Sequence, residues 1–219
     1  MLIQTSQRKL QPSTPWVSLT IIVICSLITL FYSRGDSAEQ LIWLQRWGMY
    51  LQPAAPLWPG LLLSAASTIF LHIQWAHLFG NLAFLLVFGW PVEKRLGHFY
   101  YLFLFLFSGM LVNLLLFYQQ SSFNLAGFLP VIGASGSISA IIGCYLGLFP
   151  GGKIGVYLPL GLFPQFTRLP ALLVISAWLV LQVIYTLQST LSSQMAWKIH
   201  LSGFAIGIII ALLIRKINR

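Results

Sequence analysis

The sequence predicts an all-α integral membrane protein in which six transmembrane helices form one bundle. Three observations carry this prediction. Of the 219 residues, 58% are apolar and only 7% are charged, whereas a soluble domain has about a quarter of its residues charged. The apolar residues also fall into six long runs, and a helix needs about 20 such residues to cross a bilayer.

The six runs define the expected organisation of the chain. Their approximate bounds are 16–32, 68–90, 100–119, 131–148, 169–187 and 197–214. The second run carries two histidines and an asparagine, and the fourth is rich in Gly, Ser and Ala. We therefore expect a short cytoplasmic tail at 1–15, a six-span core at 16–214 and a basic cytoplasmic tail at 215–219.

The long connection after the first run has an unusual composition. Between residues 34 and 67 it holds Trp43, Trp47 and Trp58 among prolines and leucines. Amphipathic aromatic side chains favour the membrane interface. We expect a long first loop whose short helices lie on the lipid bilayer. No internal repeat is evident, and this weakens the alternative of a small inverted-repeat transporter or channel.

The positive charges predict the orientation. Six spans place both termini on one side, and the side with more Lys and Arg is cytoplasmic. Three positives lie on one side: Arg34, Arg46 and Lys198. Nine lie on the other: Arg8, Lys9, Lys94, Arg95, Lys153, Arg168, Arg215, Lys216 and Arg219. Both termini are therefore expected in the cytoplasm, and membrane topology explains the net charge of +9 better than nucleic-acid binding does.

The shortage of acids and cysteines excludes several kinds of site. Only Asp36, Glu39 and Glu93 are acidic. An intramembrane aspartyl protease needs two aspartates in the membrane, and a Mg²⁺ or Ca²⁺ site needs several carboxylates. Cys25 and Cys144 both sit inside apolar runs, so neither suggests a disulfide or a zinc site. We expect no metal and no cofactor.

Two histidines and an asparagine open the second span. His77 and Asn81 are four residues apart and share one helical face, with His72 just before them. A single membrane histidine often only bonds to a neighbouring helix. Three polar groups together are harder to explain in this way, because polar groups in hydrocarbon are costly unless they are satisfied or face a wet cavity.

A serine between small residues opens the fourth span, in the segment Gly133-Ala134-Ser135-Gly136. Small residues in membrane helices usually serve close packing. The functional interpretation is a nucleophile near a helix N-terminus, where glycines let backbone amides approach a reacting carbonyl and the dipole favours negative charge. Both interpretations are open on this segment alone.

The sixth span opens on His200, followed by Gly203 and Gly207 on a face suited to close approach. A serine nucleophile needs a base within hydrogen-bonding distance. By the expected topology, His77, Ser135 and His200 all lie toward the outer leaflet. This common depth favours a shared site over unrelated packing residues.

Taken in order, these motifs resemble the rhomboid intramembrane serine proteases. The resemblance rests on His72-x4-His77-x3-Asn81, Glu93-Lys94-Arg95-Leu96-Gly97, Gly133-Ala134-Ser135-Gly136 and His200-x2-Gly203-x3-Gly207, and it covers residues 16–214. It implies a bacterial inner-membrane protein that cleaves transmembrane segments of partner proteins near the outer leaflet. It also implies that the fifth span and the cap over the fourth form a lateral gate.

The resemblance implies a role for each site residue. Ser135 is the nucleophile and His200 the general base of a dyad. His77, Asn81 and the Ser135 backbone N–H form the oxyanion hole. The supporting residues are His72, Gly133, Gly136, Gly203 and Gly207.

The chain departs from the family pattern at two places. Leu63-Ser64 stands where the family often has Trp-Arg, so the first loop is anchored differently. Ser139 stands where the family often has an aromatic side chain against the base. The alternative function is that of a non-catalytic rhomboid-like protein that binds transmembrane helices.

Overall fold

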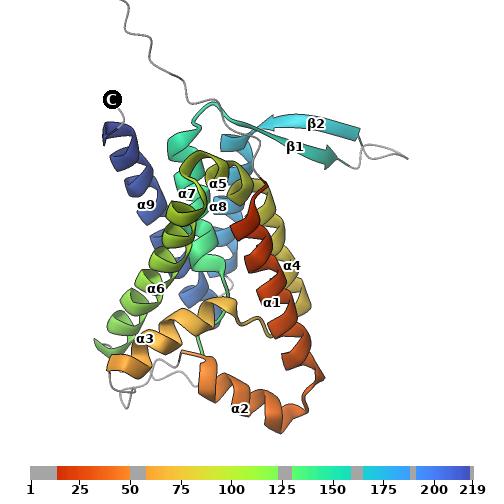
Figure 1. Cartoon of the computed structure of the whole chain (residues 1–219), viewed down its shortest axis with the longest axis vertical. Helices are drawn as coiled ribbons and strands as arrows, with labels where there is room; N and C mark the ends of the chain where they lie inside the picture. The colour runs from red at the N-terminus through yellow and green to blue at the C-terminus, as the bar shows by residue number, and fades with distance from the viewer. Residues whose placement is uncertain (1–13, 50–57, 123–129, 159–164, 188–190, 218–219) are drawn as a thin grey trace, which may run out of the picture.

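The computed structural model describes residues 14–49, 58–122, 130–158, 165–187 and 191–217 and is mostly helical (Figure 1). The helices are α1 (Trp16–Arg34), α2 (Ser37–Trp47), α3 (Trp58–Ser67), α4 (Trp75–Phe84), α5 (Trp90–Leu96), α6 (His98–Ser122), α7 (Ser135–Leu148), α8 (Ala171–Leu187) and α9 (Leu191–Ile217). The remaining elements are the 3₁₀ turn η1 (Thr68–Phe70), the π segment η2 (Leu85–Gly89) and the strands β1 (Lys153–Leu158) and β2 (Gln165–Pro170). The expected tail at 1–15 lies almost wholly outside the described residues.

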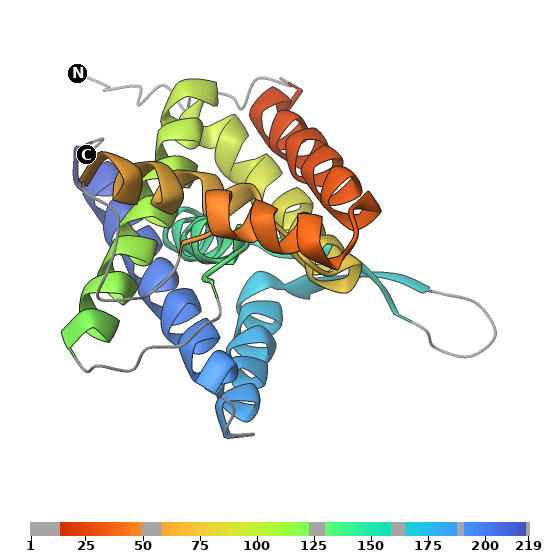
Figure 2. The ribbon, with the colours of Figure 1, turned by 90° about the horizontal axis from the view of Figure 1, so that it is seen from below.

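Helix α7 occupies the centre of the bundle. Seen from below, it is surrounded by α1, α6, α8 and α9 (Figure 2). Every residue from Gly136 to Tyr145 is buried. A helix that is apolar or small on all sides is expected in the interior of a bundle, so the composition of the fourth run explains this position.

Among the described residues, four helical segments are long and apolar enough to cross a membrane: Trp16–Arg34, Trp75–Leu96, His98–Gln119 and Trp197–Ile217. These segments support the prediction of an integral membrane protein. The fourth and fifth predicted runs form shorter apolar helices, Ser135–Leu148 and Ala171–Ile184. The count of six spans therefore stays a prediction.

The second predicted span begins later than expected. Its first residues, Thr68–Phe70, form η1, and the spanning helix starts only at Trp75. His72 therefore lies in the non-helical approach to α4. Just before Pro91 the helix widens into η2, as expected where a proline has no N–H to donate one turn back. Gly97 then ends α5 with φ +85°.

The chain is mostly helical, as expected, but two strands that were not predicted lie between α7 and α8. Strands β1 and β2 pair in antiparallel fashion, with Lys153 opposite Pro170 and Leu158 opposite Gln165. The hairpin lies at the end of the bundle away from α2 and α3 (Figure 1). The strands fall mainly in the connection between the fourth and fifth predicted runs, where no regular element was expected.

The last helix is longer than its predicted span. Helix α9 continues to Ile217, so Arg215 and Lys216 are helical rather than part of a separate tail. Arg215 Nη1 donates to the Gly147 carbonyl oxygen at 3.1 Å. This hydrogen bond joins the ends of α7 and α9.

The predicted first loop contains α2 and α3. Helix α2 begins with a capping box in which the Asp36 carboxylate accepts from the Ala38 and Glu39 amides and the Glu39 carboxylate accepts from the Asp36 amide. Both helices lie at the end of the bundle where α7 and α9 begin (Figure 1). The location of this segment on the membrane surface stays a prediction.

Glu93 connects the start of α1 to α5 and α6. Pro15 offers α1 no side-chain cap, and the buried Glu93 carboxylate accepts from the Val17 and Ser18 amides at 2.9 Å each. Ser18 Oγ donates to it at 2.6 Å, and His98 Nδ1 lies 2.7 Å from it. A carboxylate at a helix N-terminus satisfies orphan amides and complements the helix dipole.

We expect Glu93→Ala to lower the thermal stability of the detergent-solubilised protein strongly, because it leaves the buried Ser18 amide and the partly buried Val17 amide without an acceptor. A buried unsatisfied donor costs about 1–3 kcal/mol. Glu39→Ala is the matched control, since Glu39 also caps a helix but is exposed, and a change of at most about 1 kcal/mol is expected there. Equal melting temperatures for the two variants would contradict the role of Glu93.

Candidate functional site

Helices α7 and α9 approach each other until their backbones touch. A Cβ added to Gly203 would overlap the Gly136 carbonyl oxygen, and one added to Gly207 would overlap the Ala140 carbonyl oxygen. Glycine on α7 permits the same close contact, because a Cβ on Gly143 of α7 would overlap the Phe204 carbonyl oxygen of α9. This helix pair has the most extensive contact in the molecule, and glycine is what permits it.

The order of these contacts shows that the two helices run parallel. Moving along α7 from Gly136 to Ala140, the partner on α9 advances from Gly203 to Gly207. His200 is one turn before Gly203 on the same helical face. It therefore lies level with the start of α7, whose first residue is Ser135.

The segment before Ser135 is held from both sides. The Val131 amide donates to Met49 at 2.9 Å, and the Gly133 amide donates to Thr68 at 2.9 Å. The buried Thr68 hydroxyl donates to the Val131 carbonyl oxygen. Gly133 has φ +105°, which strongly favours glycine. The turn before Ser135 is thus held by Thr68 of η1 and by Met49 in the first loop.

The histidine–asparagine cluster closes on this turn. A Cβ on Gly133 would come within 2.6 Å of His77 Cε1 and 3.7 Å of Asn81 Nδ2. The rings of His72 and His77 are 5.0 Å apart. The structure therefore brings together His72, His77, Asn81 and Gly133, two residues before Ser135.

His72 orients the Asn81 side chain. Asn81 Nδ2 lies 2.9 Å from His72 Nε2, and His72 Nδ1 lies 3.4 Å from the Phe70 carbonyl oxygen. Burial, with His77 as a further cause, lowers the pKa of His72 to about 4. The ring is then neutral near pH 7, with its proton on Nδ1 and with Nε2 accepting from the Asn81 amide.

Ser135 and His200 share a level but not a hydrogen bond in the described part of the chain. His200 Nδ1 instead lies 2.6 Å from Gln182 Oε1 on α8. The Trp178 ring, also on α8, is 5.9 Å from the His200 ring. Catalytic hydrogen bonds often tighten only once substrate is bound, so the juxtaposition is compatible with a Ser–His pair.

Ser139 takes no part in holding His200. Its hydroxyl donates to the Ser135 carbonyl oxygen at 2.7 Å, one turn back on the same helix. A Cβ on Gly203 would lie 3.1 Å from the Ser139 Cβ. A larger side chain at this position would crowd α9. The aromatic ring beside His200 therefore comes from a different helix, as Trp178.

Trp178 and Gln182 were not predicted as site residues. One signal was present, because Gln182 is the only amide side chain in α8, and an amide within an apolar helix needs a partner. The partner could not be named from the sequence, because it depends on how α8 and α9 pack.

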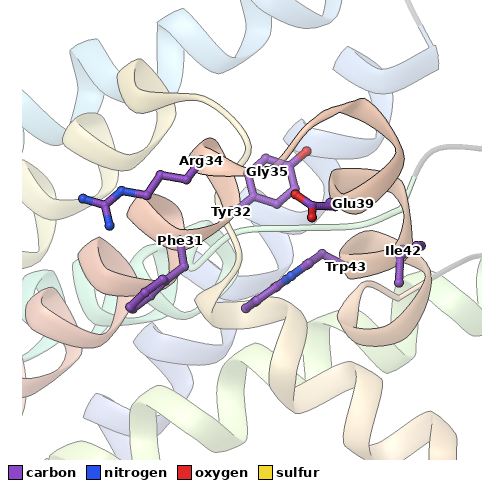
Figure 3. A pocket seen from close by; sticks show the side chains of 7 residues that line it. All are labelled: Phe31, Tyr32, Arg34, Gly35, Glu39, Ile42 and Trp43. Atoms are coloured by element: carbon purple, nitrogen blue, oxygen red, sulfur yellow. The ribbon is translucent and has the colours of Figure 1, made fainter.

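Within the described residues, His, Cys, Asp and Glu side chains form no group of three that could hold a metal ion. A cavity of about 400 Å³ lies instead at the corner between α1 and α2 (Figure 3). It is lined by Phe31, Tyr32, Arg34, Gly35, Glu39, Ile42 and Trp43. None of these is a predicted site residue.

Comparison with known proteins identifies the family of this arrangement. The family model for the rhomboid domain matches residues 59–217. No curated protein matches the chain. The matched region runs from α3 to the end of α9 and includes every predicted site residue.

We expect Gly207→Leu to separate α7 from α9, because the new side chain would overlap the Ala140 carbonyl oxygen. The loss should be at least about 2 kcal/mol in unfolding free energy, comparable to overpacking a core. Gly80→Ala on α4 is the matched control, since nothing lies within 4 Å of a Cβ there. Equal melting temperatures for both variants would contradict the close contact.

Proposed function

Because the chain belongs to the rhomboid family, whose members are generally intramembrane serine proteases, we propose that it is a serine endopeptidase that cleaves transmembrane segments with a Ser135–His200 dyad. One observation carries the proposal. The parallel glycine contact between α7 and α9 brings a serine and a histidine level at the same end of the bundle.

The chemistry of the dyad follows from the position of Ser135. Its hydroxyl attacks the scissile carbonyl while His200 Nε2 takes the proton and later donates it to the leaving amine. Ser135 is the first residue of α7, so free backbone N–H groups point toward the developing oxyanion. Water then hydrolyses the acyl-enzyme and restores the hydroxyl.

The oxyanion hole is formed by side chains from α4. His77 and Asn81 border Gly133, close to the place where the substrate carbonyl would lie. Their N–H groups and the Ser135 amide supply donors to the tetrahedral intermediate. Such donors act strongly where water is scarce, because they are already oriented when charge develops.

The substrate is a transmembrane segment that enters sideways from the bilayer. Its helix must unwind locally, because a stable helix hides its carbonyls in hydrogen bonds. Helix-weakening residues in the substrate would ease this step. The asymmetry of Lys and Arg supports an orientation in which the start of α7 lies toward the outer leaflet and both termini are cytoplasmic. The membrane we propose is a bacterial inner membrane.

A second candidate function is binding of transmembrane helices without cleavage. One observation favours it: no hydrogen bond joins Ser135 to His200 within the described residues, where the contact between His200 and Gln182 uses Nδ1 and leaves Nε2 without a serine partner. A fluorophosphonate probe separates the two functions, because it labels only an activated serine. Labelling that persists in Ser135→Ala would contradict the serine-protease proposal.

We expect Ser135→Ala and His200→Ala each to reduce cleavage of a co-expressed, tagged transmembrane substrate by at least about 10³-fold, because either change removes the unit that forms the acyl-enzyme. The measurement is the ratio of cleaved to intact substrate on an immunoblot. Ser137→Ala is the control, since the Ser137 hydroxyl is buried against Gly109 of α6. Equal cleavage by all variants would contradict the dyad.

We expect His77→Ala and Asn81→Ala to lower kcat by about 10²–10³, with little change in KM, because oxyanion donors act mainly in the transition state. The measurement is steady-state cleavage of a transmembrane peptide in detergent micelles. His72→Gln should cost less, because His72 acts only through Asn81. A larger loss for His72→Gln than for Asn81→Ala would reverse this order of roles.

A further inference from the structure

The base of the proposed dyad has a partner on α8 that the motifs did not indicate. His200 Nδ1 lies 2.6 Å from Gln182 Oε1. We propose that Gln182 is a positioning residue that holds His200 in the tautomer and orientation required of a general base. The inference rests on the proposed function and assigns to Gln182 the place that an aspartate holds in a serine-protease triad.

The hydrogen bond determines the protonation of the ring. An amide oxygen only accepts, so the His200 Nδ1 must carry a hydrogen. In the neutral imidazole this leaves the lone pair on Nε2, the atom that must take the serine proton. The amide oxygen continues to accept from Nδ1–H after Nε2 is protonated, and no charge has to move through Gln182.

The acids of the chain cannot provide this contact. Glu93 is buried against the start of α1, where its oxygens accept from Val17 and Ser18. Asp36 and Glu39 cap α2 in the first loop. A neutral amide is therefore the orienting group available at His200 in the described structure, and it avoids the cost of a carboxylate inside the bundle.

Helix α8 contributes a second contact to the same ring. Trp178 is four residues before Gln182, on the same helical face, and its ring lies 5.9 Å from that of His200 at an angle of 44°. Trp178 also lies 6.2 Å from Phe204, one turn after His200. The aromatic ring limits rotation of the imidazole while the amide selects its tautomer.

The position of α8 therefore matters to the base. Helix α9 contacts α7 through backbone and glycine, whereas α8 touches α7 far less. Displacement of α8 from α9 would withdraw Oε1 from Nδ1 and release the ring. The orientation of His200 is thus linked to the packing of α8.

The test compares two substitutions of Gln182 with wild type. Gln182→Met keeps the length of the side chain but removes the acceptor, and Gln182→Glu keeps an acceptor oxygen. Val183→Leu is the control, since Val183 is the next residue on α8 and is 52% exposed. Cleavage of a transmembrane peptide gives kcat and KM, and ¹⁵N NMR of ring-labelled histidine gives the tautomer of His200.

We expect wild type to show the hydrogen on Nδ1 of His200. Gln182→Met should lower kcat about tenfold, the value of one hydrogen bond, leave KM nearly unchanged and shift the tautomer population. Gln182→Glu should keep the Nδ1–H tautomer and most of the activity, and Val183→Leu should match wild type. If Gln182→Met does not fold, the wild-type and Gln182→Glu spectra still decide the question.

Two results would overturn the inference: a wild-type His200 with its hydrogen on Nε2, or a folded Gln182→Met with unchanged kcat and tautomer. A different result would show that the proposed function is wrong: wild type and Ser135→Ala would then give the same cleavage. The tautomer measurement then decides the role of Gln182 by itself, because it needs no activity.

Discussion

The contact between the backbones of α7 and α9 is the constraint on which the rest of the site depends. In a bilayer, lipid tails are as apolar as leucine side chains, so helices associate mainly through close packing and weak backbone contacts. Gly203 and Gly207 meet carbonyl groups of α7 directly. This contact sets the spacing of the two helices and brings His200 level with Ser135. A Cβ added at Gly203 or Gly207 would change both the spacing of the helices and the level of His200 relative to Ser135.

The two ends of the bundle have different roles. At the end with α2 and α3, Thr68 and Met49 hold the turn at Gly133, against which His77 and Asn81 pack. At the opposite end, Glu93 satisfies the first amides of α1 and pairs with His98. The buried acid thus serves stability, whereas Asp36 and Glu39, at the end of the proposed chemistry, cap α2 in the first loop. This division is consistent with a dyad whose base is oriented by a neutral group.

The side chains near the proposed dyad come from two helices besides α7 and α9 and from the segment before one of them. His77 and Asn81 lie on α4 and His72 lies just before it, while Trp178 and Gln182 lie on α8. Each polar atom in such a place needs a partner, because an unpaired polar group in a low dielectric is costly. Asn81 finds one in His72, and His200 finds one in Gln182. The hydroxyl of Ser139 finds one in its own helix.

Much of this protein could be predicted from local features of its sequence. Apolar runs predicted a membrane protein. The motifs around His77, Ser135 and His200 predicted the rhomboid family, and the match of residues 59–217 to the rhomboid domain model confirms it. These features are local, because helix length, glycine spacing and charge depend on neighbouring residues. The η1 turn, the β1–β2 hairpin and the pairing of Gln182 with His200 could not be predicted in this way. They depend on contacts between segments that only packing brings together, so the tertiary structure alone decided that α8 would supply the partner of the proposed base.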